Sequence, residues 1–429
     1  MDSKHDNRFI CGLLWDHLSI HPHGHISPCC EVDWEYPGAF ARNKNAEGKY
    51  TETVVNIAEG IDKAINSDTF KEIRKKMLSG DVPDACKTCH RVEQAGGVSK
   101  RFREAEHSVP KDYDNITAED GSINTSLENV ELRLGNYCNL KCRSCNAESS
   151  TSWIDDYYKL KNKVPLPSSY DKISKAKDSN YEWVENEEFY NELFNYSPNL
   201  RLLQISGGEP FLVDKHTKLL DLIIKSDKAK EVTISYVTNV NYNFEKIKPI
   251  LDRLKNFKFV NISFSVDDVD KRNTFIRSLS NWDVTMKNIQ NYIANYDFHY
   301  SITQTINAYN FLYVEKLTNV LVGMGIFKFD GTGPIRYINH NHVMTPDYQS
   351  ANILPLEVRR QKLDSIKGLV DPNYYEALYR NYYNTEANGK HKLFYDVTTE
   401  VDKVRRENVH DIFPELMSVI KNMLKENII

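Results

Sequence analysis

Cysteine is missing from the last two thirds of this chain, because all eight cysteines lie between positions 11 and 145. The sequence also has no run close to the roughly 18 apolar residues that a membrane-spanning helix needs. Its first residues lack the charged-then-apolar order of a signal peptide. Its net charge of −5 lacks the basic excess of sequence-independent nucleic-acid binders. These absences predict a cytoplasmic protein with no membrane segment, and they disfavour a nucleic-acid partner.

The composition is that of a globular protein large enough for two or more domains. Of the 429 residues, 40% are hydrophobic and 27% are charged, which provides a sizeable apolar core. Thiols are kept reduced in the cytosol, so clustered cysteines indicate metal or redox chemistry rather than disulfides. The two separate cysteine groups, at 11–89 and at 138–145, therefore predict two dedicated sites.

Cys138, Cys142 and Cys145 form a C-x3-C-x2-C pattern directly after the strand-like stretch at 130–137. Thiolates this close in sequence can surround only one metal centre. Three soft sulfurs suit an iron–sulfur cluster better than structural zinc, which usually recruits four protein ligands. A cube of four irons held by three thiolates leaves one iron open for another ligand. Zinc, or three cysteines without a shared role, are the alternatives at this point.

Downstream of these cysteines, strand-like runs alternate with helical patterns. The runs are rich in β-branched, aromatic and other apolar residues, as expected of buried parallel strands. This alternation predicts an α/β fold with a parallel sheet and right-handed crossovers. About six strand–helix units fall short of the eight in a full barrel, so we expect a partial (βα)6 barrel. The predicted strands are 130–134, 201–206, 232–238, 259–265 and 300–306, and helical patterns lie at 215–225, 286–296 and 311–322.

The rest of the chain divides around this partial barrel, which we place at residues 130–343. We expect a small N-terminal module at 1–98, joined to the barrel by a linker at 99–129 that is rich in charged residues, Ser and Asn. The segment 344–429 is predicted to be a helical C-terminal extension. It ends in an amphipathic packing helix that begins near Pro414.

Ser206-Gly-Gly-Glu-Pro210 follows the second predicted strand without a gap. Gly207 and Gly208 let the backbone turn sharply and approach a ligand closely. Glu209 offers a carboxylate to a cation. Taken alone, this loop has an ordinary strand-to-helix turn as its alternative.

The cysteine pattern and this loop, in this order and each after a strand, resemble the radical S-adenosylmethionine (SAM) superfamily. The resemblance implies that Cys138, Cys142 and Cys145 hold a [4Fe-4S] cluster whose open iron chelates SAM. It implies that the loop from Gly207 to Pro210, with Glu209, holds the amino group of SAM. The implied activity is reductive cleavage of SAM to a 5′-deoxyadenosyl radical, which abstracts hydrogen from a substrate.

Three further positions match the family less fully. Asn239 follows the third strand, and Ser265 ends the fourth, where the family has a serine close to the SAM ribose. Arg277 resembles the family arginine that pairs with the SAM carboxylate, a charge-assisted bond that suits guanidinium. A surface salt bridge is the alternative for Arg277. The sequence departs from the family at Asp268, where glycine is expected, and at Ser144, where an aromatic residue is common.

The other five cysteines resemble the auxiliary-cluster module called twitch, which is related to the larger SPASM module. They are Cys11, a Gly-x4-Cys at Cys29 with Cys30 beside it, and a C-x2-C pair at Cys86 and Cys89. The resemblance implies a second, auxiliary [4Fe-4S] cluster on four of them, with Cys30 as the alternative to Cys29. Zinc is the competing metal, because a C-x2-C pair with a nearby histidine is also typical of zinc. The module lies before the barrel here, whereas in most relatives it lies after it.

Two polar segments are expected to be solvated rather than functional. The histidine-rich run from His17 to His25 surrounds one proline and one glycine, which indicates an exposed loop, with metal binding as the alternative. The insertion at 159–186 indicates a surface excursion, with a flap that contacts substrate as the alternative.

These features together predict a radical SAM enzyme that receives electrons from a flavodoxin or a ferredoxin-type reductase. Relatives with auxiliary-cluster modules frequently modify peptides, so the resemblance implies a peptide or protein substrate. A small molecule or nucleotide is the alternative substrate. A non-catalytic zinc or iron–sulfur protein, for binding or electron transfer, is the alternative of another class. A SAM site at Gly207–Pro210 distinguishes the enzyme from such a carrier.

Overall fold

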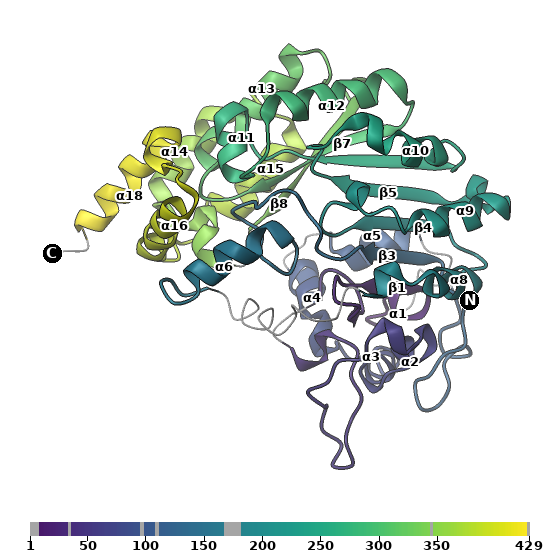
Figure 1. Cartoon of the computed structure of the whole chain (residues 1–429). Helices are drawn as coiled ribbons and strands as arrows, with labels where there is room; N and C mark the ends of the chain where they lie inside the picture. Colours follow the sequence, from purple (N-terminus) through teal and green to yellow (C-terminus); the bar gives the residue numbers. More distant parts are fainter. Residues whose placement is uncertain are drawn as a thin grey trace. The chain divides into compact units, whose positions relative to one another are not determined.

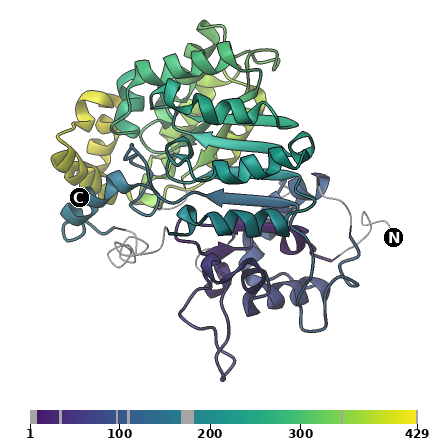
Figure 2. The ribbon, with the colours of Figure 1, turned by 45° about the vertical axis from the view of Figure 1, so that its right-hand side comes forward.

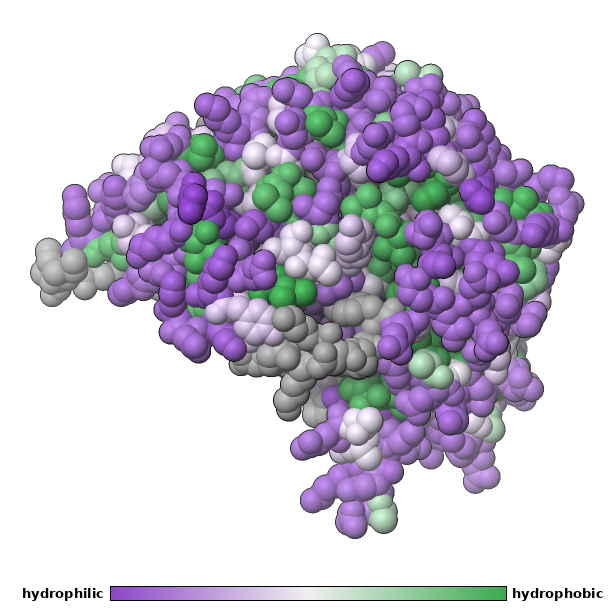
Figure 3. Space-filling model, viewed as in Figure 1, coloured by the Kyte–Doolittle hydropathy of each residue, from purple (hydrophilic) through white to green (hydrophobic). Residues whose placement is uncertain are grey.

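The structure is a computed structural model of the whole chain (Figure 1), and it describes residues 8–32, 36–94, 98–107, 111–166, 182–343 and 346–426. Within these ranges, no helix combines the length and the apolar character that crossing a membrane requires. The face shown in Figure 3 is largely hydrophilic, with apolar residues scattered over it in small groups.

The chain forms two compact units. The first consists of Met1–Gly135, Ser179–Ser235 and Pro249–Phe259. The second consists of Asn136–Asp178, Tyr236–Lys248 and Val260–Ile429.

An eight-stranded sheet is the framework of the fold, with the strand order β2-β1-β3-β4-β5-β6-β7-β8. The pair β1–β2 is antiparallel, and β1–β3, β3–β4, β6–β7 and β7–β8 are parallel. No pairing of β2 with β8 closes this sheet in the described ranges. The predicted α/β fold with a parallel sheet and a helical C-terminal region is therefore confirmed. The strands are β1 (His17–Ile20), β2 (Ile26–Ser27), β3 (Asn129–Arg133), β4 (Leu202–Ser206), β5 (Thr233–Thr238), β6 (Phe259–Ser265), β7 (His299–Ile306) and β8 (Ile335–His342).

Helices surround these strands in both units. Those of the first unit are α1 (Leu13–Asp16), α2 (Ile61–Ile65), α3 (Asp68–Leu78), α4 (Lys87–Gln94), α5 (Lys100–His107), α7 (Glu182–Glu185), α8 (Glu187–Tyr196) and α9 (Thr217–Lys225). Helix α10 (Phe244–Leu254) follows β5 and has residues in both units. Those of the second unit are α6 (Ile154–Leu160), α11 (Asp270–Ile276), α12 (Trp282–Asn295), α13 (Val314–Gly323), α14 (Leu356–Ile366), α15 (Pro372–Tyr382), α16 (His391–Arg405), α17 (Val409–Ile412) and α18 (Pro414–Glu426).

The first unit's strands have one apolar and one polar face. Side chains alternate between the faces of a strand, and residues in register on parallel strands share a face. Leu18, Val130 and Leu203 are in register and buried on one face. The opposite face carries Ser19, Glu131 and Gln204, also in register. The apolar face belongs to the core, and the polar face is available for chemistry.

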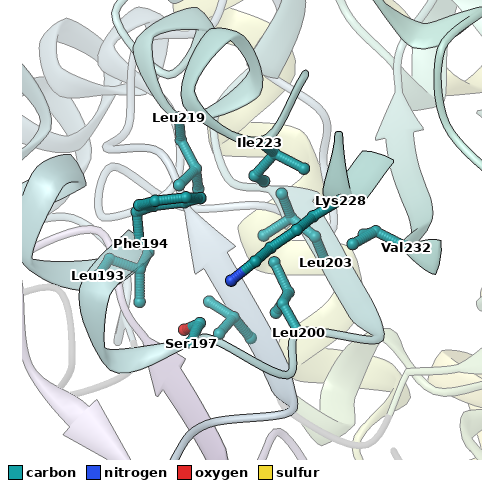
Figure 4. Close-up of a pocket in the computed structure, with 10 residues that line it drawn as sticks. Leu193, Phe194, Ser197, Leu200, Leu203, Leu219, Ile223, Lys228 and Val232 are labelled. Carbon is teal, nitrogen blue, oxygen red and sulfur yellow. The ribbon is translucent and has the colours of Figure 1, made fainter. Parts of the chain in front are cut away.

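Helices α8 and α9 cover the apolar face of β3 and β4 in the first unit. A small pocket between them is lined mostly by leucine and other apolar side chains, and the side chain of Lys228 crosses it (Figure 4). The Lys228 ammonium donates to the carbonyl of Pro198 (2.9 Å) and lies 5.3 Å from the ring of Phe194. No carboxylate, thiol or imidazole is among the lining residues, so the pocket is a packing gap in the core.

Arg74 on α3 ties together three segments of the first unit. It is fully buried, and its guanidinium donates to the carbonyls of Leu14 (2.7 Å), Ile65 (2.7 Å) and Gly121 (3.1 Å). Buried carbonyls that lose their donors each cost about 1–3 kcal/mol. The arginine therefore acts as an internal staple between α1, α2 and the segment before β3.

Arg74→Leu is expected to destabilise the protein by about 3 kcal/mol or more, because three buried carbonyls would lose their donor at once. Denaturant unfolding followed by circular dichroism measures the change. Lys71→Leu, on the same helix, is the matched control, because Lys71 pairs with the exposed Asp120 and should matter far less. Equal stability of Arg74→Leu and wild type would contradict this account of the staple.

The C-terminal helices form a core of their own in the second unit. Helices α14, α16 and α18 group together in both ribbon views (Figures 1 and 2). Helix α18 begins at Pro414 and buries Leu416, Met417 and Ile420, which confirms the predicted amphipathic packing helix. Phe413 and Phe394 belong to the same cluster.

Three strands, β1, β2 and β8, were not predicted from the sequence. The expectation that His17–His25 forms an exposed loop is wrong. Residues 17–20 form β1, His17 and His21 are buried, and the chain turns back at Gly24 (φ 78°) into β2. The parallel pairing of β1 with β3 explains the burial, because it places Leu18 and Ile20 in the core. The edge strand β8 consists mostly of polar residues and has no continuous apolar run. Much of the insertion predicted at 159–186 lies outside the described residues.

Candidate functional site

The loop that carries Cys138, Cys142 and Cys145 is braced by hydrogen bonds inside the second unit. The backbone N–H groups of Lys141 and Arg143 donate to the carbonyls of Ser278 (3.1 Å) and Ile276 (2.7 Å). These two bonds flank Cys142 and run antiparallel, so Cys142 lies opposite Arg277. The loop is thus fixed against the segment that follows α11.

Two side chains also bond to the backbone of the same loop. The indole N–H of Trp153 donates to the carbonyl of Cys142 (2.7 Å), and Ser152 donates to the carbonyl of Cys138 (2.8 Å). Trp153 is buried, whereas the side chain of Tyr137 is 58% exposed. Groups that constrain a ligand loop in this way preorganise the ligands before a metal binds.

The three thiols converge. Burial raises the pKa of Cys145 to about 12, and the charges of Cys142 and Cys138 add to the rise. Burial raises the pKa of Cys142, and the guanidinium of Arg277 opposes this rise. The side-chain amide of Asn239 donates to the sulfur of Cys138 at 3.7 Å, and the backbone N–H of Leu140 lies 3.4 Å from it. Hydrogen bonds to sulfur are a feature of thiolates that carry an iron–sulfur cluster.

Arg277 is not a surface salt bridge. Its side chain is 12% exposed, and it donates to the carboxylate of Asp267 at 3.0 Å. Asp267 is fully buried and also accepts from the backbone N–H of Thr305 (2.8 Å). Burial alone lowers the pKa of Arg277, but the negative charges of Cys142 and Asp267 outweigh it, and the pKa is raised. The structure thus brings Arg277 to the cysteine loop.

Ser265 ends β6 and shares its face of the strand with Ser263 and Asn261. It is in register with Thr303 on β7. Asp268 stands where the family has glycine. Its side chain is buried, and its carboxylate is paired with Arg272 at 3.0 Å. Desolvation raises the pKa of Asp268 to about 7, and Arg272 opposes this rise.

The Gly-Gly-Glu-Pro loop lies in the first unit, at the end of β4. Gly207 (φ 85°) and Gly208 (φ 48°) have left-handed backbones, which glycine adopts at little cost. A Cβ on Gly207 would lie 2.7 Å from the backbone of Arg133, so no larger residue fits there. Pro210 begins a short 3-10 turn (Pro210–Leu212). The sharp turn predicted from the two glycines is therefore present.

Glu209 is fully buried at the start of that turn. Its carboxylate accepts from the backbone N–H of Phe211 (3.3 Å) as a helix cap. This position is consistent with a carboxylate that receives a ligand ammonium.

Four N-terminal cysteines converge in the first unit. Burial raises the pKa of Cys11 to about 12, with a contribution from Cys89. Burial also raises the pKa of Cys29 and of Cys86, and in both cases the charge of Cys11 adds to the rise. Such mutual effects arise only between nearby groups. Cys29, rather than Cys30, shares this cluster of sulfurs with Cys86.

Cys30 has different neighbours. Burial raises its pKa, and the charges that act most strongly on it are those of Glu131 and Lys100. Burial lowers the pKa of Lys100, but the charges of Cys30, Glu104 and Glu131 together outweigh it, so the pKa is raised. The thiol of Cys30 therefore lies beside an ion-paired group on the polar face of β3, where Glu131 pairs with Arg133 at 3.2 Å.

The donor sets fit iron–sulfur clusters. Each set consists of soft sulfurs in a buried setting, and a bound metal deprotonates a thiol whose pKa burial has raised. In the part of the chain that the structure describes, no three Cys, His, Asp or Glu side chains are grouped as a site for a single metal ion. Ligands of a cluster spread over the corners of a cube and lie farther apart than the ligands of a single ion.

The functional surroundings contain residues that sequence reasoning missed. Arg101 opposes the rise in the pKa of both Cys11 and Cys86, and it pairs with Glu93 at 2.6 Å. It lies on α5, inside the stretch predicted as a polar linker, where no pattern marked it. Asp267, the partner of Arg277, follows Ser265 by two residues and could have been found from the Ser-x-Asp pattern there.

Two family models match this chain in the two regions just described. The model of the radical SAM superfamily matches residues 132–306. The SPASM model, an iron–sulfur cluster-binding domain, matches residues 11–90. The chain contains a radical SAM domain. A SPASM-type iron–sulfur domain lies ahead of the radical SAM domain, and domains of these two kinds bind a [4Fe-4S] cluster with SAM and an auxiliary iron–sulfur cluster.

Solved structures that align with this chain share 14% sequence identity with it. "Native anSMEcpe with bound AdoMet" aligns over 57% of this chain and 60% of its own, with a TM-score of 0.37. The Streptococcus suis protein SuiB aligns over 76% of this chain and 66% of its own, with a TM-score of 0.36. These alignments leave out a third or more of each neighbour, and TM-scores this low bear on neither substrate nor reaction. No curated protein sequence matches the chain.

Proposed function

We propose that this radical SAM protein cleaves SAM reductively and uses the 5′-deoxyadenosyl radical to abstract hydrogen from a peptide or protein. When bound, the SAM-binding cluster supplies the electron that breaks SAM, and the auxiliary cluster takes up an electron or anchors the substrate. The observation that carries the proposal is the convergence of Cys138, Cys142 and Cys145 on a preorganised loop. Three thiolates leave an open coordination position, as SAM chelation requires.

The chain's own residues divide the work of binding SAM. We assign cluster ligation to the three thiolates and the SAM ammonium to Glu209, in the turn that Gly207 and Gly208 make possible. Pro210 fixes the exit from that turn. Buried carboxylates bind ammonium groups strongly because water does not compete for them.

Two further residues complete this proposed site. Asn239 holds the sulfur of Cys138 and is itself held by a bond to Asn139 (2.9 Å), so we assign it to positioning that ligand. We assign Ser265 to the ribose of SAM, because its hydroxyl lies on the polar face of β6 at the end of the strand.

A neutral polar face of the sheet supports a peptide as the substrate. In the second unit, one face of β6, β7 and β8 carries hydroxyl and amide side chains in register. Ser263 and Thr303 are hydrogen-bonded (2.6 Å), and Thr303 is in register with Asn339 on β8. Uncharged donors and acceptors suit peptide groups, which carry one donor and one acceptor per residue. The residues are Asn261, Ser263, Ser265, Ser301, Thr303, Thr305, Tyr337, Asn339 and Asn341.

The remaining proposals concern module boundaries, partners and compartment. We propose an N-terminal cluster module at 1–98, a linker at 99–129, a radical SAM barrel at 130–343 and a C-terminal extension at 344–429. A flavodoxin or a ferredoxin-type reductase supplies electrons, and the protein works in the cytoplasm, where its thiols stay reduced.

Anaerobically reconstituted protein should form 5′-deoxyadenosine from SAM and dithionite, slowly even without substrate. Liquid chromatography with mass detection measures the product. Protein that carries both clusters yet forms no 5′-deoxyadenosine would favour the alternative of a non-catalytic electron carrier.

Deuterium transfer should identify the substrate class. A lysate from cells grown in heavy water is separated into a peptide and protein fraction and a small-molecule fraction, and each is incubated with protein, SAM and dithionite. If the enzyme abstracts hydrogen from a peptide, the 5′-deoxyadenosine formed with the peptide and protein fraction should contain deuterium. Deuterium that enters only with the small-molecule fraction would overturn the peptide assignment and favour a small molecule or nucleotide.

Cys29→Ala and Cys30→Ala should separate the two adjacent thiols. Loss of Cys29 should remove the auxiliary cluster, about half of the iron, because its sulfur converges with those of Cys11 and Cys86. Cys30→Ala should keep both clusters. Iron, sulfide and zinc analysis of the reconstituted variants measures which thiol is the ligand. Loss of iron in Cys30→Ala and not in Cys29→Ala would make Cys30 the cluster ligand. Zinc in place of iron at this site would contradict the auxiliary iron–sulfur cluster.

A further inference from the structure

Arg277 places a positive charge next to the cysteine loop, and none of the SAM-binding roles assigned above uses it. Arg277 lies opposite Cys142, because the hydrogen bonds on either side of Cys142 reach the residues on either side of Arg277. Its guanidinium is held away from solvent by Asp267, which is fully buried and fixed by the backbone of β7. A buried arginine with one fixed carboxylate has little freedom to leave this place.

A positive charge this close to the ligand sulfurs acts on the electron that a cluster gains. Net charge, hydrogen bonds to sulfur and solvent exposure set the potentials of iron–sulfur clusters. Charges interact more strongly where water is excluded. A fixed cation stabilises the reduced, more negative form and raises the potential, whereas a fixed anion lowers it.

We propose that Arg277, positioned by Asp267, raises the reduction potential of the cluster at Cys138, Cys142 and Cys145. This inference rests on the proposed cluster ligation. It gives Arg277 a function in the SAM-free protein, which pairing with the SAM carboxylate does not. Asp267 has a double effect, because it orients the guanidinium and partly cancels its charge.

Redox titration of the full-length reconstituted protein, followed by electron paramagnetic resonance without SAM, tests the proposal. The relevant cluster is the one whose signal changes when SAM is added afterwards. Arg277→Gln should shift its reduction equilibrium about tenfold toward the oxidised form, which for one electron is about 59 mV to lower potential. Arg277→Lys should restore most of the wild-type value. Asp267→Asn should move the potential in the opposite direction, because the amide oxygen can still accept from Arg277 and orient it while the negative charge is removed.

Arg272→Gln is the matched control. Arg272 lies on α11, five residues before Arg277, and pairs with the neighbouring Asp268 at 3.0 Å in the same manner. The charges that act most on Cys142 and Cys145 do not include it, so its loss should leave the potential unchanged.

The outcomes separate the inference from the function on which it rests. Unchanged potentials in both Arg277→Gln and Asp267→Asn, with the cluster present, would overturn the inference alone. If Arg277→Gln binds SAM more weakly but keeps the wild-type potential without SAM, the role of Arg277 is to bind the SAM carboxylate and not to set the potential. If Arg277→Gln fails to assemble the cluster, the direction of the shift in Asp267→Asn decides. Wild-type protein without a cluster at the triad would contradict the proposed function itself.

Discussion

Replacing Cys138, Cys142 and Cys145 by alanine is expected to remove about half of the iron and to abolish 5′-deoxyadenosine formation. Two four-iron clusters give about eight irons per chain, and the triple variant should retain about four. The effect on activity is complete because no other cysteine group leaves a coordination position open for SAM. Iron analysis and the SAM-cleavage assay measure both losses on the same sample.

Cys30→Ala is the control for that experiment, because it also removes a partly buried thiol but is expected to keep both clusters. Full iron content in the triple variant would mean that the triad binds no cluster. Loss of all iron would mean that the two sites are not independent.

Glu209→Ala should weaken SAM binding by two orders of magnitude or more. Removing one partner of a buried ion pair costs about 3–5 kcal/mol, and each 1.4 kcal/mol is a factor of ten in affinity. Equilibrium dialysis with labelled SAM on cluster-loaded protein measures the change. Iron content should stay at the wild-type level, because Glu209 contributes no ligand.

Glu187→Ala provides the comparison, since the Glu187 side chain is 60% exposed at the start of α8 in the same unit. It should bind SAM as the wild type does. An unchanged affinity in Glu209→Ala would remove Glu209 from the SAM site and reduce its role to capping the turn at Pro210.

Strands with continuous apolar runs were predictable from the sequence, and polar strands were not. The five predicted strands correspond to β3–β7 within one residue at each end. Strand β1 carries His17 and Ser19 on its polar face, and the last four residues of β8 alternate Asn and His, so neither strand has a continuous apolar run. Their places in the sheet follow from pairing with β3 and β7, which local sequence does not reveal.

The candidate site divides in the same way. The spacing of the cysteines predicted both cluster sites, and the two glycines predicted the turn at Gly207. Both features depend on residues close together in the sequence. The choice between Cys29 and Cys30 required the fold, since the two adjacent thiols have different neighbours. The ion pair of Arg277 with Asp267 likewise depends on how α11 meets the end of β6. The predicted module boundaries stay predictions.

The most direct test of the central claim is the electron paramagnetic resonance spectrum of the dithionite-reduced, reconstituted protein with and without SAM. The account predicts signals from two four-iron clusters, of which only one changes when SAM is added, and that signal is missing from the Cys138/Cys142/Cys145 alanine variant. A spectrum that SAM leaves unchanged, in protein with full iron content, would contradict a SAM-binding cluster at this triad.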